Sequence, residues 1–460
     1  MSELTYETKN GWKAADESLK KEIFAFSEDY IRYLNEGKTE RLACAEAVRR
    51  AEAAGFCELG KKEKLTAGDK VYLVNRDKSV YLAVVGEEDV TEGIRFVIAH
   101  IDSPRLDLKQ NPLYEDSDMT LFKTHYYGGI KKYQWTALPL ALAGVVYTRE
   151  GKKVSVRIGD GPGEPVFCVT DLLPHLADAQ MQKKATQIIE GENLNILIGS
   201  MPDADSEKDE FKIAMLKLLH EKYGIEEEDF ISAELEAFPA AAACDVGFDR
   251  SMVGGYGQDD RVCAYTALEA ILNTKSCRKT AVCVLVDKEE IGSMGNTGMR
   301  SAFFEYATAL LIEKTRGEYQ ELLLKKTFRH SQCLSSDVSA AVDPNYTDVN
   351  EKKNAAFLGR GIVMTKYTGS RGKSGTSDAN AEFVYQIRKL FNDHQIVWQS
   401  GELGKVDAGG GGTIAQYVAN LDVDVLDCGV ALLSMHSPFE IASKLDVYMA
   451  YRAYAEFFGL

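Results

Sequence analysis

The stretch VLVDKEEIG, residues 284–292, is apolar through Val284, Leu285 and Val286 and then acidic at Glu289 and Glu290. A short apolar run of this kind is typical of a buried strand. Two adjacent carboxylates repel each other, and burial raises the cost of each charge, so the pair requires a cation, a shared proton or open solvent. The stretch therefore predicts a buried strand that leads into a charged site.

Helical and strand-like segments alternate along the chain around this stretch, most clearly after about residue 249. The predicted helices span 14–35, 39–54, 260–273, 301–315 and 378–393. A β-hairpin is predicted at 70–86, because two strand-like runs are separated there by the polar residues RDK. The alternation predicts an α/β fold with a central sheet flanked by helices.

The middle of the chain, 104–248, has a different pattern. Strand-like pieces at 142–148 and 153–158 occur without the alternation of strand and helix, and a charged helical stretch follows at 203–224. We interpret this region as an inserted, mainly β domain. The segments 1–103 and 249–460 then form the first and second parts of the other domain.

Composition excludes several classes of partner. The 460 residues are 45% hydrophobic and 27% charged, which is ordinary for a globular protein large enough for two domains. A formal net charge of −16, without a cluster of Lys and Arg, argues against a nucleic-acid partner and against an anionic membrane surface.

The nine cysteines are scattered singly, without a C-x-x-C pair, and several lie inside apolar runs. This usage is typical of a reducing compartment. The N-terminal residues lack the apolar region of a signal peptide, and no segment approaches the length of a membrane span. We therefore expect a cytoplasmic protein.

Five segments end an apolar run with residues that could bind a metal. They are His100 with Asp102, Asp259 with Asp260, Glu289 with Glu290, Asp337, and His436. Polar residues at the strand ends of an open α/β sheet converge even when they are distant in sequence. Imidazole and carboxylate together suit zinc and related divalent ions, and a bridging carboxylate could hold two of them.

Each residue also has a structural interpretation when taken alone. His436 or His100 could be a hydrogen-bonded core histidine, Asp259 and Asp260 could favour a helix N-terminus, and Asp337 could form a turn. The acidic pair after residue 286 is harder to explain as a solvated face. If Glu290 binds a metal, Glu289 is free to take a proton from a water that the metal has acidified.

At these residues the sequence resembles the aspartyl aminopeptidase and vacuolar aminopeptidase I family of di-zinc exopeptidases, in its bacterial subgroup. The resemblance is carried, in order, by IAHIDSPRLDLK, QDDRVCAY, DKEEIGSMG, SSDVSAAVDPNY and LLSMHSP. It covers nearly the whole chain and implies a central mixed sheet of the zinc exopeptidase type.

The family resemblance also implies a set of roles for the site. Asp259 would bridge two metals, of which one also takes His100 and Asp337 and the other takes Glu290 and His436. Glu289 would be the catalytic base and acid, and Asp102 would orient the His100 ring. The metals would be two divalent ions per subunit, zinc above all, with cobalt or manganese as alternatives.

For the inserted domain, the family implies dimerisation, with the dimers assembling into a tetrahedral dodecamer whose active sites face an interior chamber. In relatives, a histidine of this domain helps to complete the site, and LLPHLAD places His175 at the matching position. His125 competes for that role, and His175 could equally be an exposed residue at a helix start.

Two features bear on the substrate. Arg371 and Lys373 could bind a substrate carboxylate by charge-assisted bonds, or could be a solvated pair in a loop. Asp343 stands where eukaryotic family members carry histidine before PNY, so the preferred N-terminal residue is left open between acidic and neutral.

Three other functions fit parts of the pattern. A metallo-carboxypeptidase or amide deacylase could use the same di-metal site. A glycosidase would use a pair of carboxylates but would leave His100 and His436 unexplained. A binding shell on a peptidase fold would require a broken site, whereas every expected ligand is present.

Overall fold

The computed structural model describes residues 4–460, which divide into two compact units. Unit 1 comprises the chain up to Asp102, Ala243–Met435 and Glu440–Leu460. Unit 2 comprises Ser103–Ala242 and the short segment His436–Phe439. The limits expected from the sequence, 104 and 248, lie near both ends of the longer segment of unit 2.

The largest sheet of unit 1 has nine strands. They are β1 (Cys57–Glu58), β2 (Lys70–Asn75), β3 (Ser79–Val84), β4 (Ile94–His100), β13 (Thr280–Val286), β14 (Gln332–Ser335), β16 (Ile362–Thr365), β18 (Trp398–Ser400) and β20 (Asp424–Gly429). Their order across the sheet is β1-β2-β3-β13-β4-β14-β20-β16-β18. The neighbours β13, β4, β14 and β20 run parallel, whereas β3 runs antiparallel to both β2 and β13, and β16 runs antiparallel to β20 but parallel to β18. The predicted central mixed sheet is confirmed.

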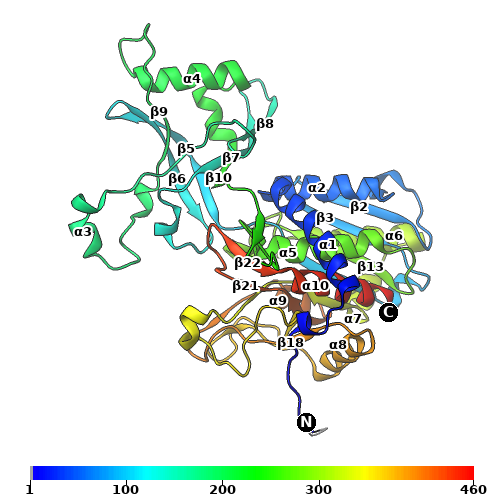
Figure 1. Cartoon of the computed structure of the whole chain (residues 1–460). Coiled ribbons are helices and arrows are strands. Elements are labelled where there is room, and N and C mark those ends of the chain that lie inside the picture. Colours follow the sequence, from blue (N-terminus) through cyan, green and yellow to red (C-terminus); the bar gives the residue numbers. More distant parts are fainter. Residues whose placement is uncertain (1–3) are drawn as a thin grey trace. The chain divides into compact units, whose positions relative to one another are not determined.

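Helices cover both faces of this sheet (Figure 1). The helices of unit 1 are α1 (Glu17–Glu36), α2 (Glu40–Ala53), α5 (Gln258–Asn273), α6 (Phe303–Arg316), α7 (Glu321–Arg329), α8 (Ala381–Asp393), α9 (Ala415–Ala419) and α10 (Lys444–Gly459). On one face, Val97 and Ala99 of β4 share a core with residues of α1, α2, α5, α8 and α10. On the other face, Phe96 and Ile98 share a core with α6, α7 and α9. Because both faces are buried, β4 and β13 are mostly apolar rather than alternating, with Phe96–Ala99 and Ala281–Val286 as continuous apolar runs.

The helices predicted at 14–35 and 39–54 are present as α1 and α2, although α1 begins later than predicted, at Glu17. The side chain of Asp16 accepts the backbone N–H of Leu19 at 2.8 Å, and that of Thr39 accepts the backbone N–H of Leu42 at 3.4 Å. Such caps satisfy N–H groups that have no acceptor inside the helix. The hairpin is confirmed as well, because β2 and β3 pair antiparallel.

Two smaller sheets complete unit 1. One has the order β11-β12-β22-β21-β15 and the other pairs β17 with β19. Their strands are β11 (Cys244–Val246), β12 (Met252–Gly255), β15 (Ser339–Ala340), β17 (Gly369–Ser370), β19 (Gly410–Gly411), β21 (Ala431–Leu433) and β22 (Glu440–Ser443). The five-stranded sheet matters for the site, since β12 leads into α5.

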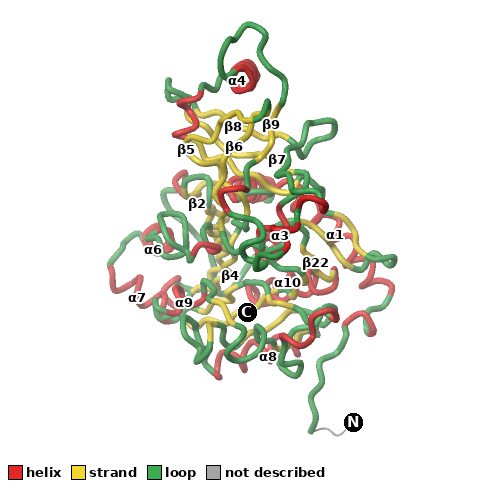
Figure 2. The backbone as a smooth tube through the Cα atoms, turned by 90° about the vertical axis from the view of Figure 1, so that its left-hand side faces the viewer, coloured by secondary structure: helices red, strands yellow, loops and turns green. Residues whose placement is uncertain are grey.

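Unit 2 is mainly β (Figure 2). Its elements are β5 (Arg105–Asp116), β6 (Met119–Tyr127), β7 (Leu140–Tyr147), β8 (Lys153–Ile158), α3 (Asp178–Met181), β9 (Ile196–Gly199), α4 (Glu210–Tyr223) and β10 (Ala233–Pro239). The strands form one antiparallel sheet in the order β8-β7-β10-β5-β6-β9. The mainly β character expected of the inserted region is therefore present.

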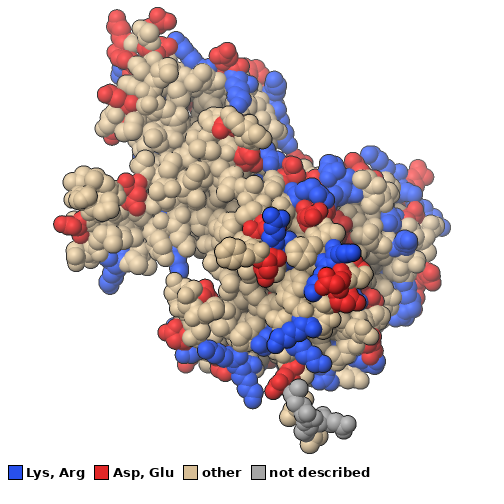
Figure 3. Space-filling view, viewed as in Figure 1, with Lys and Arg blue, Asp and Glu red and all other residues tan. Residues whose placement is uncertain are grey.

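The distribution of surface charge and the state of the cysteines are as the composition indicates. In Figure 3, Lys and Arg are interspersed with Asp and Glu on the face in view. All nine cysteines lie within the described residues and are free thiols. None of the helices in the described chain combines enough length with enough apolar character to span a bilayer.

Candidate metal centre

His100 is the last residue of β4, which lies between two parallel neighbours in the sheet. It pairs with Val286 at the end of β13. On the other side, Ser336 directly after β14 donates its backbone N–H to the Ile98 carbonyl oxygen at 2.7 Å. The carboxyl ends of three parallel strands therefore meet at His100, which is where open α/β sheets form their sites.

The two ring nitrogens of His100 face different partners. Nδ1 lies 3.0 Å from the Asp102 carbonyl oxygen and 3.2 Å from Asp102 Oδ1. Nε2 lies 3.2 Å from Asp259 Oδ1 and 3.9 Å from Asp337 Oδ1. If Nδ1 carries the proton and donates it to Asp102, Nε2 presents its lone pair to the acids, which is how metal-binding histidines are oriented.

Asp259 and Asp260 occupy the first turn of α5 and are joined by a cis peptide bond. Both are buried, with 3% and 0% of their surface exposed. Asp259 points its carboxylate at the His100 ring, whereas Asp260 Oδ2 accepts the His100 backbone N–H at 3.3 Å. The two neighbours thus approach His100 from its side chain and from its main chain.

Glu289 and Glu290 lie just after β13, in the 3₁₀ turn Glu289–Ile291. Asp102, which is fully buried, accepts both of their backbone N–H groups, that of Glu289 at 3.1 Å on Oδ1 and that of Glu290 at 3.2 Å on Oδ2. One carboxylate therefore holds the turn that carries the acidic pair.

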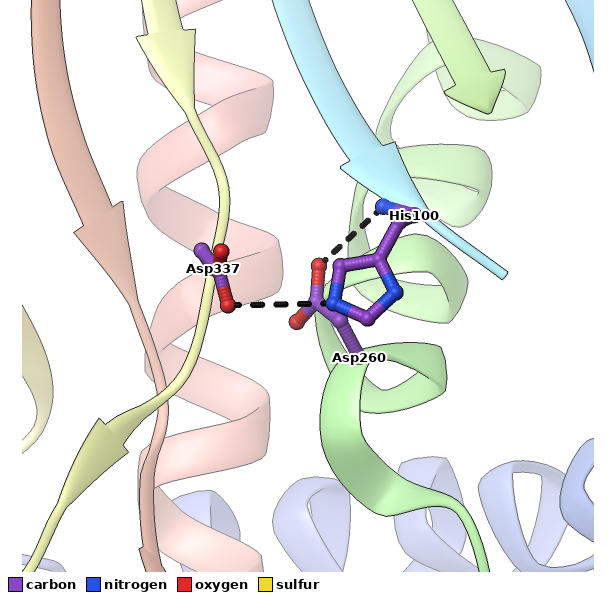
Figure 4. Close-up of side chains that lie close together, drawn as sticks. All are labelled: His100, Asp260 and Asp337. Carbon is purple, nitrogen blue, oxygen red and sulfur yellow. Dashed lines mark hydrogen bonds and ion pairs between the residues drawn. The ribbon is translucent and has the colours of Figure 1, made fainter. Parts of the chain in front are cut away.

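Asp337 follows β14 and completes the cluster. Figure 4 shows His100 with Asp260 on its backbone side and Asp337 across from its ring. The possible ligand atoms form two sets, and within each set all atoms lie within 4.8 Å of one another. One set comprises His100, Asp260 and Asp337, and the other comprises His100, Asp259 and Glu290. The sets share the imidazole, so the acids on both sides of it belong to one site.

The electrostatics of this site favour a cation. Burial first, and then the charge of Asp260, raise the pKa of Asp337 well above its usual range. Burial likewise raises the pKa of Asp260. Burial alone would lower the pKa of His100, but its bonds to Asp102 and Asp259 raise it well above the usual value. Several buried acids around one imidazole are costly unless a positive charge is shared among them.

The residues present fit a divalent metal. Asp260 Oδ1 is buried without a hydrogen-bond partner, so part of the cluster's acceptor capacity is unused within the described chain. Imidazole nitrogen and carboxylate oxygen are the donors that zinc takes in hydrolytic enzymes. The donor set and its burial therefore suit zinc.

His436 and His175 belong to unit 2. His436 Nδ1 lies 2.9 Å from the Gly129 carbonyl oxygen, in the short segment that clusters with that unit. His175 is exposed, in the 3₁₀ turn Pro174–Leu176, and its competitor His125 is exposed on β6. The roles expected of His436 and His175 stay predictions.

Arg371 and Lys373 lie in an exposed loop of unit 1, and both have positive φ. Lys373 Nζ lies 2.8 Å from Asp378 Oδ2 and 3.7 Å from the centre of the Tyr367 ring. The charge of Lys373 is therefore already paired, which the sequence did not indicate.

Residues 33–458 match the family described as aminopeptidase I zinc metalloprotease (M18). The chain belongs to the M18 family of zinc metallo-aminopeptidases. Two relatives in that family are the probable M18 family aminopeptidases 1 of Clostridium acetobutylicum and Thermotoga maritima. They are 52% and 46% identical to this chain, with alignments that cover 99% and 98% of each partner.

Solved structures agree with the M18 assignment. The crystal structure of the M18 aminopeptidase of Thermotoga maritima has a TM-score of 0.96 at 45% identity, covering 99% of this chain and 100% of that one. Aminopeptidase I of Clostridium acetobutylicum has a TM-score of 0.92 at 49% identity, covering 99% and 100%. The mApe1 dodecamer of S. cerevisiae is 18% identical with a TM-score of 0.76, covering 94% and 95%, and shows the shared fold alone.

Sequence reasoning grouped Asp260 with Asp259 but assigned it no role. Its bond to the His100 backbone arises because β4 packs beside α5, and the only signal in the sequence was the pair of adjacent acids. The contact of Asp102 with the amides of Glu289 and Glu290 was also missed, since nothing in HIDSP points to a partner 187 residues away.

Proposed function

We propose that this aminopeptidase removes N-terminal residues from peptides with two divalent metal ions per subunit, and that Glu289 acts as general base and acid. The observation that carries the proposal is the convergence of His100, Asp259, Asp337 and Glu290 at the carboxyl ends of β4, β13 and β14. Zinc is the proposed metal, with cobalt or manganese as substitutes.

The proposed ligand sets follow the family pattern. Asp259 would be shared by the two ions, His100 and Asp337 would bind one, and Glu290 and His436 would bind the other. The short approach of Asp259 to His100 Nε2, 3.2 Å, supports their sharing an ion. When bound, the metals supply Lewis acidity, which lowers the pKa of a water molecule and polarises the scissile carbonyl.

The protein residues then divide the remaining work. Asp102 holds the His100 ring and the main chain of Glu289 in one geometry. Glu289 takes a proton from the attacking water and delivers it to the leaving amine. The charge of Glu289 contributes to the raised pKa of Asp337, which supports a position of the Glu289 carboxylate beside the cluster.

The decisive experiment compares substitutions of the adjacent residues Glu289 and Glu290. We expect Glu289→Gln to retain both metals and lose turnover by about 10²–10⁴-fold, because proton transfer alone is removed. Glu290→Gln should lose metal, because it removes a ligand. Metal content by elemental analysis and hydrolysis of amino-acid p-nitroanilides measure both. Full activity in the Glu289→Gln protein would exclude its role as base.

A carboxypeptidase or an amide deacylase would use the same metal chemistry as an aminopeptidase. Only the aminopeptidase requires a free N-terminal amine on its substrate. Membership of the aminopeptidase family favours removal of the N-terminal residue. Parallel assays of one peptide with a free and an N-acetylated amine separate them. Hydrolysis of the free peptide only supports our proposal, and equal hydrolysis of both contradicts it.

For the substrate, we propose that His175 completes the site and that Arg371 and Lys373 interact with a substrate carboxylate. A panel of peptides that differ only in the first residue, assayed with defined metals, tests whether acidic or neutral residues are preferred. Of the two cations, Arg371 is the better candidate, because Lys373 is bound to Asp378.

We also propose that unit 2 mediates dimerisation and that dimers assemble into a tetrahedral dodecamer in the cytoplasm. The related mApe1 of S. cerevisiae forms a dodecamer. The free state of all nine cysteines fits a reducing compartment. Light scattering should give a mass about twelve times the chain mass of 50.9 kDa, and a monomer mass would contradict the assembly.

A further inference from the structure

Glu440 is the first residue of β22 and has only 1% of its surface exposed. β22 runs antiparallel to β12, and Glu440 pairs with Gly255, the last residue of β12. The chain passes from there through Tyr256 and Gly257 directly into α5. Glu440 is thus held beside the turn that carries Asp259.

Both the main chain and the side chain of Glu440 bind this turn. Its Oε2 accepts the backbone N–H of Asp259 at 3.0 Å. Its carbonyl oxygen accepts Nε2 of Gln258 at 2.6 Å, and Gln258 Oε1 accepts the hydroxyl of Tyr30 at 3.0 Å. Consecutive residues of the α5 turn are therefore fixed to the start of β22 by buried hydrogen bonds.

The hydrogen bond from Asp259 to Glu440 explains how the backbone of Asp259 keeps a conformation that is unusual for a helical turn. Asp259 has φ −80° and ψ 107°, which is not helical, although it lies in the first turn of α5. N–H groups of a first turn have no acceptor within the helix, and a carboxylate is the strongest side-chain acceptor for them. A negative charge at this end is also favoured by the helix dipole.

The position of the backbone of Asp259 sets the position of its carboxylate. While Glu440 holds the N–H group, Asp259 Oδ1 lies 3.2 Å from His100 Nε2. Without that bond, the N–H group would be buried and unpaired, and the turn would rearrange to satisfy it. Rearrangement would move the carboxylate away from the ring.

We propose that Glu440 is a positioning residue for metal binding, acting through its hydrogen bond to the backbone of Asp259. This inference rests on the proposed role of Asp259 as a metal ligand. Residues that orient a ligand in this way change metal affinity by about 10–100-fold when they are replaced.

Asp446 provides a matched control in the same unit. It is fully buried, and its two carboxylate oxygens accept the backbone N–H groups of Gly359 at 2.7 Å and of Gly361 at 2.6 Å. It therefore makes the same kind of bond as Glu440, but to a loop that carries none of the proposed ligands. Asp446→Ala should lower the free energy of unfolding without changing zinc affinity.

The experiment measures zinc affinity of the metal-free, full-length protein by competition with a chromophoric chelator, together with kcat and KM of the zinc-loaded protein. We expect Glu440→Ala to weaken zinc binding by about 10–100-fold. Glu440→Gln should recover most of that loss, because its amide oxygen can accept the same N–H. With saturating zinc, kcat should fall more than KM rises, because Glu440 is buried and its effect reaches the site through Asp259.

Unchanged zinc affinity in Glu440→Ala would overturn the inference, as would an equal loss in Asp446→Ala. If Glu440→Ala does not fold, Glu440→Asp decides, because its carboxylate keeps the charge but is one methylene too short to accept the Asp259 N–H in the same place, so zinc binding should weaken there and stay near normal in Glu440→Gln. Asp259→Asn separates the two proposals. If Asp259→Asn binds zinc normally, the proposed ligand set fails, whereas zinc loss there with normal binding in Glu440→Ala refutes only the role of Glu440.

Discussion

Asp102 Oδ1 accepts the backbone N–H of Glu289 at 3.1 Å. The same carboxylate lies 3.2 Å from Nδ1 of His100, so one buried acid is shared by a proposed metal ligand and the proposed base. A change at Asp102 should therefore affect metal binding and proton transfer together.

Asp102→Asn tests this sharing. The asparagine side chain keeps one acceptor oxygen and places an NH₂ group where a second acceptor is needed. We expect both metal affinity and turnover to fall, each by about 10–100-fold. Elemental analysis and kcat at saturating zinc measure the two effects. Normal values of both would mean that Asp102 has no positioning role.

Removal of the metals should abolish activity and lower stability. Treatment with a chelator should stop peptide hydrolysis, and added zinc, cobalt or manganese should restore it. Ligands that bind only the folded state raise the free energy of unfolding by about 2.7 kcal/mol at a hundred times their Kd, so the melting temperature should rise when zinc is returned. A glycosidase would survive the chelator.

Asp427 should make stability depend on pH. Burial raises its pKa to about 7 from an ordinary 3.8, although Thr413 donates a hydrogen bond to it at 2.8 Å. Because the folded state holds the proton more tightly, Asp427 contributes stability below about pH 4 that is lost as the pH rises to about 7.

Asp427→Asn lacks this titration and can still accept the bond from Thr413. Its free energy of unfolding should rise relative to the parent across this window, by about 1.4 kcal/mol for each pH unit. Denaturant titrations of both proteins over the window measure the difference. Parallel pH profiles would show that Asp427 does not titrate as expected.

Arg371 and Lys373 should differ in their effect on substrate binding. Lys373 is paired with Asp378, and exposed ion pairs contribute only about 0–1 kcal/mol. We therefore expect Lys373→Ala to leave KM for peptides nearly unchanged and Arg371→Ala to raise it. Steady-state kinetics on one peptide compare the variants. A rise of KM in Lys373→Ala alone would reverse the assignment.

Local patterns in the sequence predicted the elements that depend on neighbouring residues. The helix after Thr39 has a cap residue that can be recognised in the sequence, and the 70–86 hairpin has a short polar turn, whereas the cap at Asp16 was not predicted. The position of β13 between β3 and β4 could not be predicted, because the strand that enters there follows unit 2 in the sequence. The short strands of the five-stranded sheet are too brief to give a pattern.

The features of the site also fall into those that the local sequence predicted and those that it could not predict. Strand ends marked His100, Glu290 and Asp337 as residues that would converge. The contacts that hold the site, such as Glu440 with the backbone of Asp259, depend on strand pairing between distant segments. The pairing of Lys373 with Asp378 was not predicted, because Lys373 was interpreted as a loop charge and Asp378 as the first residue of the helix at 378–393.

The interval along the chain between His100 and Glu440 has a consequence for biosynthesis. β4 is translated long before β22, whose first residue, Glu440, accepts the backbone N–H of Asp259. A ribosome-bound intermediate therefore lacks an assembled catalytic apparatus. Metal loading of the proposed site should therefore follow the synthesis of β22.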